Sequence, residues 1–203
     1  HLMTASDILF GDSPLFFQEL EQALVHPFYP EVVLGWVASK PELLPMLDAV
    51  RAAARRLRRD RHVRAVILTG EGPSFCAGLD IKSVLGNPVS AAAGVASLFS
   101  PTRNRFQEWS MAWRDVPAPV IAAIHGNCFG AGLQLALGAD IRLVTPDARL
   151  SVMEVRWGLV PDMGGAALMR ELVPLDVAKE LAMTGRIISG TEAHALRLVT
   201  RIT

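Results

Sequence analysis

Residues 118–145 read APVIAAIHGNCFGAGLQLALGADIRLVT. The apolar run 118–126 ends in glycine, which is typical of a buried strand followed by a turn. Residues 130–139 place leucine and small side chains at helical spacing, and 140–145 return to the composition of a strand. A strand, a glycine turn, a helix and a second strand in this order indicate an α/β fold with mainly parallel strands.

The same alternation continues on both sides of this segment. The pattern predicts strands over 31–37, 63–69, 118–126, 140–145 and 148–154. It predicts helices over 15–24, 44–59, 102–116, 130–139, 166–172, 177–185 and 191–200. We find no internal repeat, and we expect one domain over residues 1–203.

The composition excludes several classes of protein. The 203 residues are 51% hydrophobic, and 20 Lys and Arg balance 20 Asp and Glu, so no excess charge indicates a nucleic acid or an anionic membrane as partner. Two cysteines do not make a disulfide framework, and we expect a reducing, cytoplasmic location. No stretch reaches the roughly 18 apolar residues of a membrane span. We assign no metal site.

One basic cluster, RAAARRLRRDRHVR, covers residues 51–64. Apolar residues recur at helical spacing through the same region, at Leu47, Val50, Ala54 and Leu57. This periodicity favours the solvated face of an amphipathic helix over a binding patch for a polyanion.

Two glycine loops follow predicted strands. Gly78 lies within SFCAGLD (74–80), and Gly130 and Gly132 open the predicted helix 130–139. Glycine lets a ligand approach the backbone, and a helix start presents unpaired N–H groups. The loops are therefore either ordinary turns or the two halves of an oxyanion hole.

Cys76 in the first loop has two interpretations. A nucleophilic thiol needs a base, and His125 or His62 would have to lie close. A buried structural cysteine is the favoured interpretation. We give His125 no catalytic part.

Three longer segments resemble the enoyl-CoA hydratase/isomerase (crotonase) family. They are VRAVILTGEGPSFCAGLDI (63–81), PAPVIAAIHGNCFGAGLQLALGADIRL (117–143) and RLSVMEVRWGLVPDMGG (149–165), and AKELAMTGRIISGTEAHALRLVTRI (178–202) continues the match. The resemblance covers 44–202, and residues 1–43 are atypical. It implies a ClpP/crotonase spiral of β-β-α units, with the C-terminal helical region of the family either truncated or absent after Thr203.

The same resemblance implies the ligand and the assembly. Family members bind acyl-CoA thioesters, so coenzyme A is expected as part of the substrate and no permanently bound cofactor is expected. The family also implies a homotrimer or a hexamer formed as a dimer of trimers.

By resemblance, the backbone N–H groups of Leu79 and Ala131 form the oxyanion hole, although the family usually has glycine where Ala131 stands. The segment CAGLDIK lies where the family holds CoA. The residues that the resemblance places against substrate or CoA are Cys76, Ala77, Gly78, Asp80, Ile81, Lys82, Gly130 and Gly132. Arg197 also stands where the family usually has glycine.

Three side chains are candidates for acid–base chemistry. Glu154 matches the second glutamate of a hydratase of the family, whereas Gln134 occupies the place of the first. An amide cannot take up or release a proton near neutrality, which disfavours hydration by two carboxylates. Asp162 follows Glu154 by eight residues, the separation of a Glu and Asp pair in dienoyl-CoA isomerases of the family.

Each carboxylate also has a structural interpretation. Glu154 is either catalytic or part of a surface ion pair, and Asp162 either assists catalysis or caps a helix that begins near Gly164. The preferred function is an acyl-CoA enzyme that shifts a proton and a double bond. The alternatives are a 2-enoyl-CoA hydratase and a catalytically silent acyl-CoA-binding protein.

Overall fold

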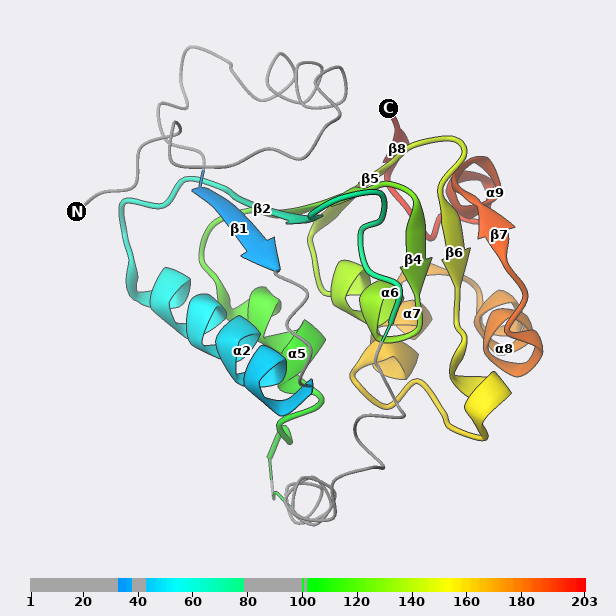
Figure 1. The fold of residues 1–203 in the computed structure, drawn as a ribbon, viewed down its shortest axis with the longest axis horizontal. Helices are drawn as coiled ribbons and strands as arrows, with labels where there is room; N and C mark the ends of the chain where they lie inside the picture. Colours follow the sequence, from blue (N-terminus) through cyan, green and yellow to red (C-terminus); the bar gives the residue numbers. More distant parts are fainter. Residues whose placement is uncertain (1–32, 38–42, 79–99, 101) are drawn as a thin grey trace.

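A parallel five-stranded sheet is the central element of the fold (Figure 1). The computed structural model describes residues 33–37, 43–78, 100 and 102–203, with side chains from residue 46 onward. The strands lie in the order β1 (Val33–Val37), β2 (Val66–Gly70), β3 (Val120–Ile124), β5 (Ile141–Val144) and β8 (Arg201–Ile202). All four pairings in this sheet are parallel, which confirms the predicted α/β class.

A second, smaller sheet lies beside the first. It contains β4 (Asn127–Phe129), β6 (Arg149–Ser151) and β7 (Ile188–Ser189), with β4 and β6 parallel and β6 and β7 antiparallel. Strands β4, β7 and β8 were not predicted, because two or three residues are too few to show a period.

The helices and helical turns fill the connections. They are α2 (Leu43–Arg59), α5 (Glu108–Met111), η2 (Ala112–Asp115), α6 (Ala131–Leu137), η3 (Glu154–Trp157), α7 (Gly165–Leu172), α8 (Leu175–Thr184) and α9 (Gly190–Ala195). The helix predicted over 15–24 lies outside the described residues.

Three predicted elements are clearly shorter in the structure, and one of them is the helix expected over 191–200, which ends at Ala195. The helix expected over 102–116 is shorter, because Asn104 and Gln107 exchange side-chain to backbone hydrogen bonds of 2.8 and 3.2 Å at its start. Its last turn tightens into the 3₁₀ turn η2. The strand expected over 148–154 ends at Ser151, and Glu154 instead begins η3.

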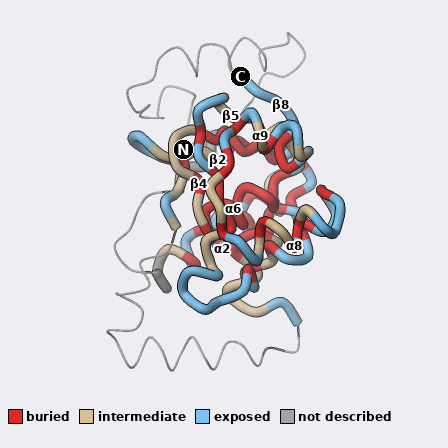
Figure 2. The backbone as a smooth tube through the Cα atoms, turned by 90° about the vertical axis from the view of Figure 1, so that its right-hand side faces the viewer, coloured by how far each residue is buried: buried red, intermediate tan, exposed pale blue. Residues whose placement is uncertain are grey.

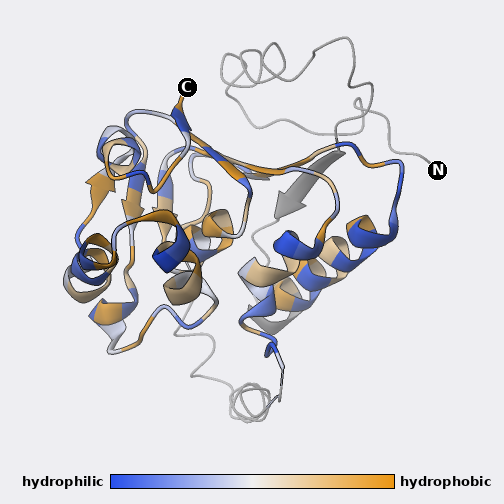
Figure 3. Cartoon of the chain, turned by 180° about the vertical axis from the view of Figure 1, so that it is seen from behind, coloured by the Kyte–Doolittle hydropathy of each residue, from blue (hydrophilic) through white to orange (hydrophobic). Residues whose placement is uncertain are grey.

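The basic cluster is the outer face of α2, as predicted. Leu47, Val50, Ala54 and Leu57 are buried, and α2 contacts α5 and η2 on the same side of the sheet (Figures 1 and 3). Its arginines form ion pairs with acidic residues of those turns, namely Arg51 and Arg55 with Glu108 and Arg58 with Asp115.

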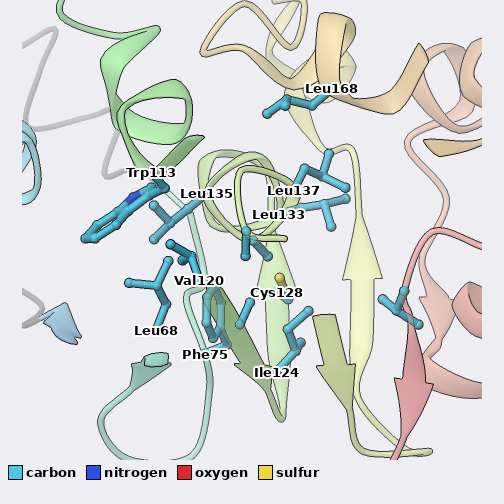
Figure 4. Close-up of a cluster of buried hydrophobic side chains, with 14 of the residues drawn as sticks. Leu68, Phe75, Trp113, Val120, Ile124, Cys128, Leu133, Leu135, Leu137 and Leu168 are labelled. Atoms are coloured by element: carbon cyan, nitrogen blue, oxygen red, sulfur yellow. The ribbon is translucent and has the colours of Figure 1, made fainter. Parts of the chain in front are cut away.

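Helix α6 lies at the centre of the core. All seven of its residues are buried, and it appears as a continuous buried segment in Figure 2. Leu135 faces Trp113 and the side chains of Leu68 and Val120 from the sheet, and Leu133 lies near Cys128 (Figure 4). A helix that is buried on every side is positioned by packing rather than by solvent.

Arg197 has a left-handed backbone conformation, with φ of 63°. It follows α9 in a Schellman arrangement, in which the Leu198 N–H donates to Ala193 O at 2.9 Å and the Arg197 N–H donates to His194 O. Glycine is the usual residue at such a position because it has no Cβ to clash with the carbonyl.

We expect Arg197→Gly to raise the free energy of unfolding by about 0.5–1 kcal/mol, since it removes the left-handed strain. The matched control is Arg197→Ala, which removes the same exposed side chain but keeps the Cβ. Urea unfolding of both variants measures the effect. Equal stability of the glycine and alanine variants would contradict the explanation.

Candidate active site

The two glycine loops predicted from sequence lie side by side. Residues 75–76 run parallel to β4: the Phe75 N–H donates to His125 O at 2.8 Å, and the Phe129 N–H donates to Cys76 O at 3.0 Å. Two residues beyond this ladder, a Cβ on Gly78 would lie 3.2 Å from Phe129 O. The structure therefore brings Gly78 to the beginning of the second loop.

Gly130 turns the chain from β4 into α6. Its φ of 52° and ψ of −119° are accessible almost only to glycine. Its N–H donates to Ser151 O at 2.9 Å. Ala131 is the first residue of α6, so its N–H has no acceptor within the helix. Trp109 Nε1 donates to Ala131 O at 2.7 Å and holds this residue in place.

A cavity of about 100 Å³ opens next to Ala131. One wall is backbone from the two loops, contributed by Ala77, Gly78, Gly130 and Ala131. The polar side chains in the lining are Gln134, Glu154 and Asp162, and the apolar ones are Phe129, Met153, Trp157, Leu159, Val160 and Met163. All three predicted acid–base candidates therefore share one cavity with Ala131. Trp157, Leu159 and Val160 are exposed, so the outer part of the cavity is apolar.

Gln134 and Glu154 are directly hydrogen-bonded. Gln134 Nε2 donates to Glu154 Oε1 at 2.6 Å, and the Gly165 N–H at the start of α7 donates to Gln134 Oε1 at 2.8 Å. Gln134 is 2% exposed, so both ends of a buried amide are paired. Glu154 Oε2 is buried and has no hydrogen-bond partner among the described residues.

Burial raises the pKa of Glu154 above its ordinary value, and the negative charge of Asp162 acts in the same direction. The hydrogen bonds from its own backbone and from Gln134 oppose these effects. No Lys, Arg or His in the described part of the chain forms an ion pair with Glu154, which argues against the surface ion pair.

Asp162 does not cap the following helix. Gly164 is the N-cap of α7, and no side chain accepts a hydrogen bond there. Asp162 is exposed, lies at the cavity, and influences the pKa of Glu154. The capping interpretation is therefore wrong, and the carboxylate lies where it can act on a ligand.

Other predicted residues have structural surroundings. Cys76 and Gly132 do not line the cavity but pack against each other, and a Cβ on Gly132 would lie 2.5 Å from Cys76 O. Burial raises the pKa of the Cys76 thiol, which suits a structural cysteine better than a nucleophile. His125 Nε2 lies 3.0 Å from Gly72 O. Leu79, Asp80, Ile81 and Lys82 lie outside the described residues.

Sequence reasoning missed Gly165 and Trp109. Gly165 supplies the donor that orients Gln134, and Trp109 holds the carbonyl of Ala131. The second glycine of DMGG was the available signal for Gly165, but nothing in the sequence connects Trp109 with a residue 22 positions later.

Within the described residues, no three His, Cys, Asp or Glu side chains gather as ligands for a metal ion. None of the helices there is both long enough and apolar enough to span a bilayer.

Comparison with known proteins identifies the family. The family model described as Enoyl-CoA hydratase/isomerase matches residues 44–203. The chain belongs to the enoyl-CoA hydratase/isomerase family. The crotonase-like fold predicted from the resemblance is thereby confirmed.

Individual relatives carry different activities in their names. Mouse mitochondrial methylglutaconyl-CoA hydratase is 32% identical over 83% of this chain and 51% of its own length. The peroxisomal Δ(3,5)-Δ(2,4)-dienoyl-CoA isomerase of Arabidopsis thaliana is 36% identical over 74% of this chain and 56% of its own. This chain thus spans about half the length of these two curated relatives.

A solved relative contains the ligand that the family implies. The crystal structure of a Thermobifida fusca protein in complex with CoA superimposes with a TM-score of 0.73 and is 32% identical. The match covers 85% of this chain and 68% of that one.

The raised pKa of Glu154 predicts a dependence of stability on pH. A raised pKa means that the folded protein binds this proton more tightly than the unfolded chain, so no stability is lost below the ordinary value of 4.5. As the pH rises through that value towards the raised pKa, ionisation is less favourable in the folded state and stability falls.

We expect Glu154→Gln, which stays neutral, to be more stable than the wild type at pH 7, with an advantage that shrinks towards pH 4.5. Urea unfolding at several pH values measures this difference. Glu71→Gln removes an exposed carboxylate and serves as the control, with little change expected. An advantage for Glu154→Gln that is independent of pH would show that ionisation is not its cause.

Proposed function

We propose that this chain isomerises a double bond in an acyl-CoA thioester, with Glu154 as the group that moves the proton. The observation that carries the proposal is the pairing of Glu154 with an amide: Gln134 donates to Oε1, while Oε2 is unpaired in a cavity lined by Ala131. The site therefore supplies one partly buried carboxylate beside an amide, where a two-carboxylate route to hydration requires two carboxylates.

The thioester oxygen is the expected ligand of the backbone wall. In the proposal, the N–H groups of Ala131 and Leu79 donate hydrogen bonds to this oxygen. Negative charge builds up there when C2 of the acyl chain loses a proton, and fixed donors stabilise it because they need no reorganisation. Support comes from Ala131, which has no acceptor within α6 and whose carbonyl is held by Trp109.

One residue can carry out both proton transfers of this reaction. Glu154 takes a proton from C2 of a 3-enoyl-CoA, which leaves a dienolate on the thioester, and returns it to C4 to give the 2-enoyl-CoA. No water or redox partner is consumed. The raised pKa of Glu154 suits a group that is a base in the first half and an acid in the second.

Asp162 extends the proposal to conjugated chains. A 3,5-dienoyl-CoA becomes a 2,4-dienoyl-CoA when a proton leaves C2 and another is added at C6, so two groups at separate positions are useful. Asp162 lies at the same cavity as Glu154 and is exposed, so it is the candidate for the second group. The Arabidopsis relative carries this isomerisation in its name.

Coenzyme A enters as part of the substrate. Ala77 and Gly78 line the cavity and belong to the loop that the family resemblance places against CoA, together with Asp80, Ile81 and Lys82. The Thermobifida relative, which was solved in complex with CoA, supports CoA as the ligand. No cofactor is proposed to remain bound.

Hydration of a 2-enoyl-CoA is the second candidate, and the name of the mouse relative favours it. Water addition would have to proceed with one carboxylate beside the neutral Gln134. Binding of acyl-CoA without turnover is the third possibility. The assay below separates all three.

Assembly and location are further parts of the proposal. Exposed Trp157, Leu159 and Val160 around the cavity, with Met183 on α8, are an apolar surface of the kind found between subunits. We propose a homotrimer or a dimer of trimers in the cytoplasm. Sedimentation of the purified chain would test the assembly, and a monomer at micromolar concentration would contradict it.

We expect purified protein to convert 3-enoyl-CoA or 3,5-dienoyl-CoA faster than it hydrates 2-enoyl-CoA. Glu154→Gln should lower the isomerisation rate by about 10²–10⁴-fold, because it removes the acid–base group but keeps the acceptor for Gln134. Asp162→Asn should impair the dienoyl substrate more than the 3-enoyl substrate.

Product analysis by mass spectrometry and ultraviolet absorbance measures these rates. Unchanged turnover in Glu154→Gln would disprove the role of Glu154. Faster hydration than isomerisation would favour the second candidate. Tight binding without any product, measured by calorimetry, would favour the third.

A further inference from the structure

The amide of Gln134 lies between two groups that determine its orientation. Gly165 N–H can only donate, so the group 2.8 Å from it must be the amide oxygen. The other end of the amide, 2.6 Å from Glu154 Oε1, is then the NH₂ group. The donor on α7 thus resolves the orientation of a side chain whose oxygen and nitrogen are otherwise easily interchanged.

Packing prevents the amide from leaving this position. Gln134 is buried on α6, and a Cβ on Gly165 would lie 2.6 Å from its Cγ and its Oε1. Helices α6 and α7 are in contact at this point. Gly165 is therefore both the donor to the amide and the residue whose small size makes room for it.

This orientation has a consequence for the two oxygens of Glu154. An NH₂ group can only donate, so Oε1 has to accept in both protonation states of Glu154. A proton on the carboxyl group is then placed on Oε2. Oε2 has no partner among the described residues, and Glu154 lines the cavity.

We propose that Gln134 is a positioning residue that reserves Glu154 Oε1 as an acceptor and makes Oε2 the oxygen that takes up and returns the proton. The inference rests on the proposed function for the identity of the proton donor, an acyl chain. The chain of hydrogen bonds from Gly165 through Gln134 to Glu154 does not depend on a substrate.

The groups in hydrogen-bond contact with the Gln134–Glu154 pair carry no charge. The groups that α6 and α7 present to this carboxylate, the Gln134 amide and the Gly165 N–H, are neutral. Within the described residues, the charge that acts on its pKa is that of Asp162, in the loop before α7. A glutamate at position 134 would place two carboxylate oxygens in contact, and such a pair shares one proton.

The first test uses the wild-type protein without substrate. In a ¹⁵N–¹H NMR titration with labelled glutamine, we expect the two Nε2 protons of Gln134 to have clearly different chemical shifts. We expect these chemical shifts to change with pH as Glu154 ionises. This pH dependence of the chemical shifts should be absent in Glu154→Gln. A Gln134 amide that shows no response to pH would overturn the inference, whatever the enzymatic activity.

The second test uses Gln134→Met, which keeps the length of the side chain but removes the donor. We expect kcat for isomerisation to fall by about 10–100-fold, with little change in KM, because a hydrogen bond to a charged group is lost. The acidic limb of the rate profile should move to higher pH, since a donor that stabilised the carboxylate is gone.

Two further variants separate this role from a structural one. Leu133→Met changes a neighbouring buried position of α6 and should leave the pH profile unchanged. Gln134→Glu keeps an acceptor for Gly165 N–H and should change the acidic limb into two steps. A wild-type profile in Gln134→Met would overturn the inference while leaving the proposed function in place. If Gln134→Met does not fold, the NMR titration of the wild type decides.

Discussion

The structure depends on a close backbone contact between the loop after β2 and strand β4. Cys76 and Cys128 form a parallel β-bridge through their backbones, and the carbonyl of Cys76 accepts a hydrogen bond from the N–H of Phe129. Side chains at Gly126 and Gly132 would prevent this approach, because a Cβ would lie 1.9 Å from Pro73 O and 2.5 Å from Cys76 O respectively. The ladder places Gly78 beside Phe129, so a contact between two backbones creates one wall of the cavity.

Helix α6 connects this wall with the hydrophobic core. Its apolar residues Leu133 and Leu135 pack between the sheet and the neighbouring helices, while Gln134 between them faces Glu154 and α7. A buried amide is costly when unpaired, but both ends of this one are satisfied. The helix thus holds a polar group in the site with the rigidity of close packing.

Much of this was predictable from sequence for a physical reason. The alternation of apolar strands and helices predicted the α/β class, and the family resemblance implied that the loops of Gly78 and Gly130 form one site. The spacing between Gln134 and Glu154 also placed both in one site by resemblance, and the structure shows them in contact.

The remaining features depend on tertiary contacts. The donor to Gln134 comes from Gly165, for which the second glycine of DMGG is the one local signal. The group that holds Ala131 comes from Trp109, for which the sequence offers no local signal. The expected strand around Glu154 was wrong because Met153 adopts a helical conformation, and the Arg156 N–H donates to its carbonyl at 3.1 Å to begin a 3₁₀ turn. That turn, rather than strand alternation, sets the direction of the Glu154 side chain.

The replacement of a carboxylate by an amide decides how protons can be handled in this cavity. Two carboxylates in contact titrate in two coupled steps, and together they offer one group to take a proton from water and another to give a proton to carbon, as the addition of water across a double bond requires. An amide and a carboxylate in contact hold one mobile proton, and the amide keeps it on the oxygen that it does not contact. A double-bond shift needs no more than this, because the proton that leaves one carbon is the proton that returns to another. Because its partner is neutral, Glu154 titrates in one step. Burial raises the pKa of Glu154, which suits a group that both accepts and donates a proton. The chemistry that the site favours therefore follows from the hydrogen-bonding capacity of one side chain on a buried helix.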